Sequence, residues 1–288
     1  MDEQTDNNAV LRAKKRFMVV IVGHACSLKC KDCGNLDPYA PADTMVYSMP
    51  DIISNLDVVL SHLEIAQVQV QGGEPFLHKD LPDLIKYVTE TRKKRLLIAT
   101  NGTIMPKFDF SLLKNERITV RISDYPVVKN IGLQLMKELE KAGVQSRVYE
   151  FNTKKGRWYN KGGVDVPRED NDEIVSSRFE NCDNKHCLTL DNGKLAHCSR
   201  GVISERIQGY SSLQTDYLTV EDTMDFRRSL YKYVKEKKFI TACRYCLGTN
   251  ESDTIEPALQ LESFEGKTNK MEAQARWPGK LKNLLSRK

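Results

Sequence analysis

The stretch that decides the fold reads FMVVIVGHACSLKCKDC and covers residues 17–33. Its first part, residues 17–23, is rich in Val and Ile and predicts a buried strand. Cys26, Cys30 and Cys33 follow that strand in a C-x3-C-x2-C spacing. Three thiolates at this spacing suit three corners of a [4Fe–4S] cube, because such clusters are held by Cys thiolates. The remaining iron is then open to a substrate or cofactor, which favours catalysis over electron storage.

Two other uses of these cysteines compete with a cluster. Structural zinc sites generally take four ligands from paired Cys or Cys/His units, whereas this group is odd in number and has only His24 as a nearby extra ligand. A disulfide framework suits short secreted chains, but 288 residues are enough for a large core, and the first ten residues do not resemble a signal peptide. We therefore expect reduced thiols, a cytoplasmic location and a cluster rather than zinc.

The composition is that of an ordinary soluble globular protein. Hydrophobic residues make up 40% and charged residues 29% of the chain, and no run approaches the roughly 18 apolar residues that a membrane span needs. The formal net charge is +5, and the basic residues are scattered or lie near the ends. We therefore expect neither nucleic acid nor a membrane as a partner.

Strand and helix patterns alternate along the first half of the chain, which predicts βαβ units and a parallel sheet. Strands are expected at 66–71, 95–100, 118–123 and 144–151, and helices at 50–63, 81–91 and 128–142. Unusual residues follow successive strands: the cysteines, then GGEP (72–75), TNGT (100–103) and SDYP (123–126). In barrel-like α/β folds the active site lies at the C-terminal ends of the strands, so these four segments are expected to converge on one rim.

The second half of the chain holds the other five cysteines, namely Cys182, Cys187, Cys198, Cys243 and Cys246. Asp191–Asn192–Gly193 predicts a hairpin turn, and residues 221–237 read as a helix that precedes the last C-x2-C pair. The polar segment 152–180 is expected to be a long loop or lid. Residues 250–288 read as a polar and then basic tail, in which 277–285 either form a docking helix or stay mobile.

Three segments together resemble a radical S-adenosylmethionine (SAM) enzyme, over about residues 17–151: the C-x3-C-x2-C run, GGEP, and TNG at 100–102. The resemblance implies a partial (β/α)6 barrel, a cluster whose open iron is chelated by SAM, and cleavage of SAM to a 5′-deoxyadenosyl radical. Asp32 stands where many members have an aromatic residue, so no adenine contact is expected from that side chain. The implied SAM-binding residues are Gly72, Gly73, Glu74, Pro75, Thr100, Asn101 and Ser123.

The second cysteine group resembles the auxiliary-cluster region of SPASM and the shorter twitch radical SAM enzymes. The pattern is Cys182-x10-Gly193-x4-Cys198, followed by Cys243-x2-Cys246, with no later cysteine. The resemblance therefore implies one auxiliary [4Fe–4S] cluster on Cys182, Cys198, Cys243 and Cys246, with Cys187 as the alternative to Cys182 and zinc as the alternative metal. The implied organisation is a flexible arm (1–15), a radical SAM core (16–151), a loop or lid (152–180), an auxiliary-cluster region (181–250) and a tail (251–288).

A twitch region on a chain of this length resembles the 2-deoxy-scyllo-inosamine dehydrogenases of aminocyclitol antibiotic biosynthesis. This implies a radical SAM oxidoreductase that takes hydrogen from a small sugar, aminocyclitol or nucleotide-sugar and oxidises a secondary alcohol. The auxiliary cluster would accept an electron, and a flavodoxin or ferredoxin would supply electrons to the enzyme. Candidate catalytic residues are Asp124, Tyr125 and Arg200, each of which also suits a solvated or capping role, and Arg157, Trp158 and Tyr159 are candidates to cover the pocket.

Other functions remain open at this point. Related architectures epimerise sugars or modify peptides and protein side chains. An alternative of another class is a non-enzymatic iron–sulfur or zinc protein that carries electrons or acts as a scaffold. GGEP and TNGT at strand ends favour the enzyme, because an electron carrier has no need of a SAM pocket.

Overall fold

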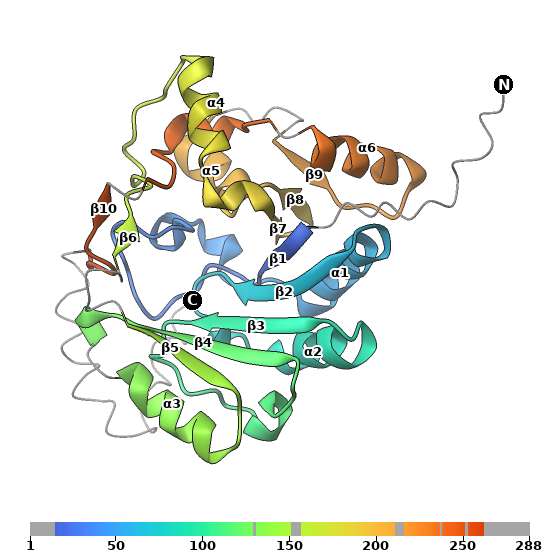
Figure 1. Ribbon diagram of the computed structural model, residues 1–288, viewed down its shortest axis with the longest axis vertical. Coiled ribbons are helices and arrows are strands. Elements are labelled where there is room, and N and C mark those ends of the chain that lie inside the picture. Colours follow the sequence, from blue (N-terminus) through green and yellow to red (C-terminus); the bar gives the residue numbers. More distant parts are fainter. Residues whose placement is uncertain are drawn as a thin grey trace.

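The structure, a computed structural model, describes residues 15–128, 131–150, 157–210, 216–236, 238–250 and 253–261. An eight-stranded sheet with the order β5-β4-β3-β2-β1-β7-β8-β9 runs through the molecule (Figure 1). Its parallel part consists of β5 (Ser146–Glu150), β4 (Ile118–Asp124), β3 (Arg95–Thr100), β2 (Ile65–Gln71), β1 (Lys15–Ile21) and β7 (Cys187–Asp191). The sheet continues antiparallel through β8 (Lys194–Ala196) and β9 (Tyr217–Thr219), while β10 (Thr254–Ile255) pairs separately with β6 (Trp158–Tyr159).

The helices form two groups, one on each half of the sheet (Figure 1). Beside β1–β5 lie α1 (Met49–His62), α2 (Leu81–Lys86), which continues as a π-turn over Tyr87–Thr91, and α3 (Ile131–Lys141). Around β7–β9 gather α4 (Asp172–Glu180), α5 (Arg200–Gln208) and α6 (Met224–Lys235). Short 3-10 turns cover Asp37–Tyr39, Ala42–Thr44, Pro75–Leu77, Phe110–Leu113, Pro126–Val128, Asp183–His186 and Thr241–Tyr245. Among the described residues, no helix is both long and apolar enough to cross a lipid bilayer.

The alternating apolar pattern of the sequence explains the core. In α1 the buried residues Met49, Ile52, Leu56 and Val59 recur every three or four positions, so they form one stripe that packs on the sheet. Pro50 lies in the first turn of that helix, where its missing N–H costs no hydrogen bond. Strand and helix patterns that alternate along the first half of the chain predicted an α/β class with a parallel sheet. The α/β class with a mostly parallel central sheet is confirmed.

The segment 152–180, expected to be a loop or lid, contains regular structure. Strand β6 and helix α4 both fall within it. The helix begins at a side-chain cap, since Asn171 Oδ1 accepts hydrogen bonds from the backbone N–H groups of Glu173 (2.9 Å) and Ile174 (3.2 Å). Within α4 only Val175 and Phe179 are buried, so the helix has too few apolar residues for its periodicity to be read from sequence.

Two further parts of the second half differ from the expected picture. Helix α5 begins two residues after Cys198, where no helix was predicted. The first part of the expected tail, residues 258–261, returns to the cysteine loop, with backbone bonds from Lys31 N to Leu259 O (2.7 Å) and from Leu261 N to Lys29 O (2.9 Å). The expected docking helix at 277–285 and nearly all of the expected arm lie outside the described residues.

Candidate functional site

The glycines of GGEP allow two chain segments to lie in direct contact at the C-terminal ends of β1 and β2. A Cβ atom on Gly73 would lie 2.1 Å from the carbonyl oxygen of Ala25, and one on Gly72 would lie 2.2 Å from that of Gly23. Backbone bonds join the same segments, from Gly73 N to Gly23 O (3.0 Å) and from Glu74 N to Ala25 O (2.8 Å). Only glycine permits this approach. The GGEP segment therefore lies directly against residues 23–25, at the start of the cysteine loop.

Glu74 joins the GGEP segment to the end of β3. Its Oε1 accepts hydrogen bonds from Thr100 Oγ1 (2.7 Å) and Phe76 N (3.1 Å), and its Oε2 accepts one from Asn101 N (2.8 Å). The residue is 2% exposed, and burial raises the pKa of its carboxyl to about 7 although the hydrogen bonds lower it. Glu74 therefore holds two of the expected SAM-binding segments in register.

Asn101 carries that connection on to the cysteines. Its Nδ2 donates to Ser27 Oγ (3.0 Å) and lies 3.5 Å from Cys26 Sγ, while its Oδ1 accepts from Thr103 N (2.9 Å). The strand-end segments after β1, β2 and β3 thus meet at one place, as the positions of their motifs predict.

Cys26, Cys30 and Cys33 pack in one cluster with Leu28, Val128, Tyr125, Trp158 and Ala258. Burial raises the pKa of the Cys30 thiol to about 11, and burial together with the nearby Asp37 carboxylate raises the pKa of Cys26 and Cys33 well above the usual value. Buried thiolates require a positively charged partner, which the iron of a cluster supplies. The donor set therefore fits a [4Fe–4S] cluster held by three cysteines.

His24, the extra ligand considered for zinc, lies in a buried charge network instead of facing the cysteine sulfurs. Its Nδ1 is 2.7 Å from Asp37 Oδ1 and its Nε2 is 3.6 Å from Asp191 Oδ2. Asp37 Oδ2 also accepts a hydrogen bond from Cys33 Sγ at 3.1 Å. Burial alone lowers the pKa of His24, but Asp191 and Asp37 outweigh that effect and raise the pKa to about 9.

The C-terminal end of β4 and the residue after it place their polar side chains on different sides. Ser123 is buried and hydrogen-bonds Tyr125, whose ring stands edge-on to Trp158 with the centroids 5.4 Å apart. Tyr125 packs against the cysteine cluster, and burial raises the pKa of its hydroxyl. Asp124 is directed toward α3, because a Cβ on Gly132 would lie 3.3 Å from Asp124 Oδ1. Of these two catalytic candidates, Tyr125 is the one that lies against the cysteines.

A pocket lies among the elements of the second half. Cys182, Cys198, Cys243 and Cys246 line it, although they come from three separate segments of the chain. Burial raises the pKa of Cys198 to about 11 and that of Cys243 well above the usual value, and the neighbouring sulfurs add to both shifts. Four converging, half-buried thiols fit a fully ligated [4Fe–4S] cluster.

Cys187 has a different position. It lies in β7, opposite Phe17 of β1, and does not contribute to the lining of the pocket. Within the described ranges, no three Cys, His, Asp or Glu side chains come close enough together for a single metal ion.

Arg200 connects the two cysteine groups. It lines the pocket and is 3% exposed, and its three donor nitrogens reach backbone carbonyls: Nε to Gly34 (3.1 Å), Nη1 to Lys161 (3.1 Å) and Nη2 to Gly162 (2.6 Å). Gly34 directly follows Cys33, so the guanidinium links the first cysteine loop to the wall of the second site. The sequence placed Arg200 among the catalytic candidates, whereas here its hydrogen bonds go to the backbone.

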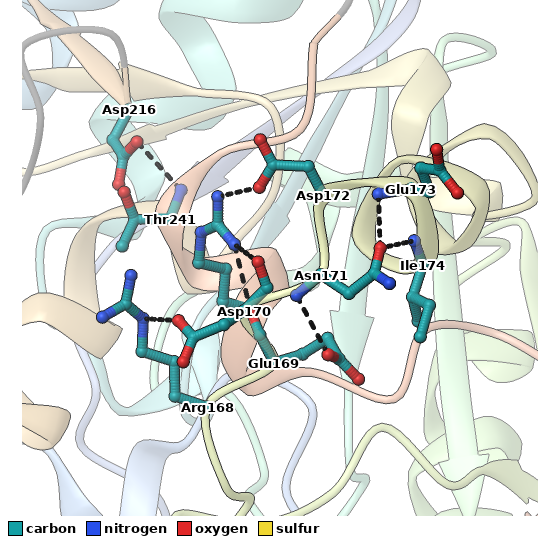
Figure 2. Close-up of polar contacts among 10 residues, drawn as sticks. Arg168, Glu169, Asp170, Asn171, Asp172, Glu173, Ile174, Asp216 and Thr241 are labelled. Atoms are coloured by element: carbon teal, nitrogen blue, oxygen red, sulfur yellow. Dashed lines mark hydrogen bonds and ion pairs between the residues drawn. The ribbon is translucent and has the colours of Figure 1, made fainter.

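A second arginine fastens the chain in front of α4 to the last cysteine pair. Arg244 lies between Cys243 and Cys246, donates to the carbonyls of Glu169 (3.1 Å) and Asp170 (3.3 Å), and pairs with Asp172. Figure 2 labels the partner residues Glu169, Asp170 and Asp172 and marks the polar contacts of this region with dashed lines. Sequence reasoning did not single out Arg244, although its place inside a C-x2-C pair was a signal.

Comparison with known proteins agrees with this site. A family model described as a 4Fe-4S single cluster domain matches residues 15–143. A putative glycyl-radical enzyme activating enzyme of Methanocaldococcus jannaschii is 26% identical over 115 residues, which are 40% of this chain and 43% of that protein. A probable GTP 3′,8-cyclase of Sulfolobus acidocaldarius is 28% identical over 131 residues, which are 46% of this chain and 40% of that protein. The match thus spans less than half the length of either relative.

The crystal structure of BtrN in complex with AdoMet and 2-DOIA aligns over 84% of this chain and 96% of that chain, with a TM-score of 0.52 and 17% identity. This likeness shows a shared fold. The family match over residues 15–143 and the similarity to these curated relatives support the radical SAM superfamily as the class of this protein. The matched family model is that of a 4Fe-4S cluster domain, which fits the three-cysteine site.

Proposed function

We propose that this radical SAM enzyme oxidises a secondary alcohol on a small polar substrate, such as a sugar, aminocyclitol or nucleotide-sugar, and uses an auxiliary [4Fe–4S] cluster as electron acceptor. The observation that carries the proposal is the convergence of Cys182, Cys198, Cys243 and Cys246 on one pocket. A cluster with four protein ligands has no open iron, so it suits electron transfer better than substrate binding. The crystal structure of BtrN in complex with AdoMet and 2-DOIA supports a small ligand in a fold of this kind.

The proposal assigns Cys26, Cys30 and Cys33 to the first cluster and a radical SAM core to residues 16–151. The parallel strands β1–β5 belong to this core, and β7 adds the sixth parallel strand of the partial barrel from outside that range. Bound together, the cluster and SAM supply the radical chemistry that removes a hydrogen atom from substrate. The SAM-binding residues are those expected from the motifs, Gly72–Pro75, Thr100, Asn101 and Ser123. Glu74 supports this role indirectly, because its carboxylate holds Thr100 and Asn101 beside the cysteine loop.

Two aromatic residues shield the first site, and two arginines hold the segments around the second site in place. Tyr125 and Trp158 cover the cysteine cluster with their edge-on rings, which keeps water away from a reactive intermediate. Arg200 is a positioning residue in this proposal, because its three backbone contacts hold the first cysteine loop against the auxiliary site. Arg244 fastens the chain before α4 over the same site.

The test is anaerobic reconstitution with iron, sulfide, SAM and dithionite, followed by assays for 5′-deoxyadenosine and for a ketone product from candidate polyols and sugars. The triple variant Cys26→Ala/Cys30→Ala/Cys33→Ala should keep roughly four iron atoms and lose SAM cleavage. The double variant Cys243→Ala/Cys246→Ala should lose the auxiliary iron, keep SAM cleavage and form no ketone.

Cys187→Ala is the matched control, since Cys187 does not line the pocket, and it should keep both clusters. SAM cleavage by the triple variant would contradict the assignment of the first site. Ketone formation without the auxiliary iron would contradict the role of the second site. A fully loaded, SAM-bound protein that releases no 5′-deoxyadenosine would favour an electron carrier, and an epimer or a modified peptide as product would replace alcohol oxidation.

A further inference from the structure

Residues 258–261 form a short segment that pairs with the first cysteine loop. Two backbone hydrogen bonds hold it there, from Lys31 N to Leu259 O and from Leu261 N to Lys29 O. Cys30 and Gln260 are partners in an isolated antiparallel bridge. The bridge brings a residue from the far end of the described chain directly beside a cysteine of the first cluster site.

The Gln260 side chain is 5% exposed, and its surroundings determine the orientation of its amide. Its Oε1 accepts the backbone N–H of Lys29 at 2.7 Å. Its Nε2 donates to the carbonyl of Ala258 at 2.6 Å and to Cys30 Sγ at 3.3 Å. The reverse orientation would place two donors against each other at Lys29 and two acceptors against each other at Ala258, so an N–H group must face the sulfur.

We propose that Gln260 is a positioning residue of the radical SAM cluster, and that its amide N–H holds the Cys30 sulfur and raises the reduction potential of that cluster. Hydrogen bonds to cluster sulfurs withdraw negative charge from them and so favour the reduced state. The contact is shielded from water, which strengthens it. This inference rests on the proposed function only in taking Cys30 as a cluster ligand.

Each of the three cysteine sulfurs has a different neighbour. Cys26 Sγ accepts from Leu28 N (3.4 Å) and Asn101 Nδ2 (3.5 Å), whereas Cys33 Sγ lies against the Asp37 carboxylate. Among the described residues, Gln260 is the side-chain donor to Cys30. Since the backbone bonds of Leu259 and Leu261 do not involve the Gln260 side chain, a substitution there can remove the N–H···S contact while the segment stays in place.

The experiment compares Gln260→Met, which has similar length and no donor, with the wild-type holoenzyme. EPR-monitored redox titration follows the cluster whose signal changes when SAM is added, and iron is quantified in parallel. Gln260→Met should keep its iron and show about a tenfold lower ratio of reduced to oxidised cluster at a fixed potential, which corresponds to about 59 mV for one electron. Gln134→Met, at an exposed position on α3, is the control and should titrate as the wild type does.

Gln260→Glu provides a second variant, because it can still accept the Lys29 N–H but presents an oxygen to Cys30. It should shift the potential in the same direction and by at least as much. A wild-type potential in both variants at full iron content overturns the inference. Loss of the first cluster from both variants with the auxiliary cluster retained also overturns it, since Gln260 would then only hold the loop. A wild-type protein in which no cluster responds to SAM would instead refute the proposed function.

Discussion

Replacing the buried carboxyl of Glu74 should change how the stability of the protein depends on pH. The pKa of this carboxyl is raised from 4.5 to about 7, chiefly by burial, so the folded protein binds a proton there more tightly than the unfolded chain does. The contribution of Glu74 to the free energy of unfolding is therefore fully present below pH 4.5 and is lost as the pH rises through about 7. The shift corresponds to about 3 kcal/mol, at 1.36 kcal/mol for each pKa unit.

Glu74→Gln removes the titrating group and with it this part of the pH dependence. At pH 8 the variant avoids burial of a charge, but one amide N–H must face either Asn101 N or the donors of Thr100 and Phe76, at a cost of about 1–3 kcal/mol. The two effects nearly offset each other at pH 8. At pH 5 the folded wild type carries a protonated Glu74 and buries no charge there. Only the hydrogen-bond cost of the glutamine then remains, so the variant should be clearly less stable than the wild type.

The assay is thermal melting of the metal-free, reduced protein at pH 5 and pH 8. For a chain of this size 1 kcal/mol shifts Tm by roughly 2–4 °C, so the wild type should lose about 6–12 °C more than Glu74→Gln between the two pH values. Other groups that titrate in this range, including His24, are common to both proteins and cancel in the comparison. Equal changes of Tm with pH in the two proteins would refute the reasoning.

Three further substitutions test the contacts around the two cysteine sites. Gly73→Ala places a methyl group against the Ala25 carbonyl, a backbone atom that cannot move aside, so it should cost about 1–3 kcal/mol and lower the iron content of the first site. Arg200→Met leaves one buried and two partly buried carbonyls without their donor and should cost about 3 kcal/mol, measured as a lower Tm. Arg244→Met removes the contacts to residues 169–172 and should increase hydrogen exchange in that segment.

Each of these changes has a control in the same chain. Gly163→Ala is expected to be tolerated, since the nearest atom to its new methyl group would be 3.7 Å away. Arg206→Met removes an exposed arginine that pairs with Asp43, so it should leave Tm almost unchanged. Arg168→Met, at an exposed ion pair beside the Arg244 contacts, should leave hydrogen exchange in 169–172 as it is. Equal effects of a substitution and its control would contradict the assigned contacts.

The first half of the molecule was readable from sequence because its signals are local. A strand of Val and Ile, a cysteine loop and a glycine pair follow one another within residues 17–75, and each motif lies at the end of a strand. Parallel strands bring their ends to one edge, so the meeting of Gly73, Asn101 and Cys26 follows from their positions along the chain.

The second half was harder to read because its elements depend on contacts between distant residues. Helix α4 buries only Val175 and Phe179, and its polar surface resembles that of a loop. Arg200 looked suitable for a substrate, and only folding reveals that three carbonyls from two other segments occupy its donors. Polarity alone does not distinguish an arginine that binds a ligand from one that holds the backbone.

The sequence by itself predicted the three-cysteine loop and the parallel sheet, because spacing and periodicity are properties of neighbouring residues, and its motifs resemble those of the radical SAM superfamily. Only the tertiary structure decided which cysteines line the second pocket, since spacing favoured Cys182 but left Cys187 as an alternative, and the two lie in different surroundings. It alone also brought Gln260 to Cys30. Contacts between residues so far apart depend on how the whole chain packs, and no local pattern encodes them.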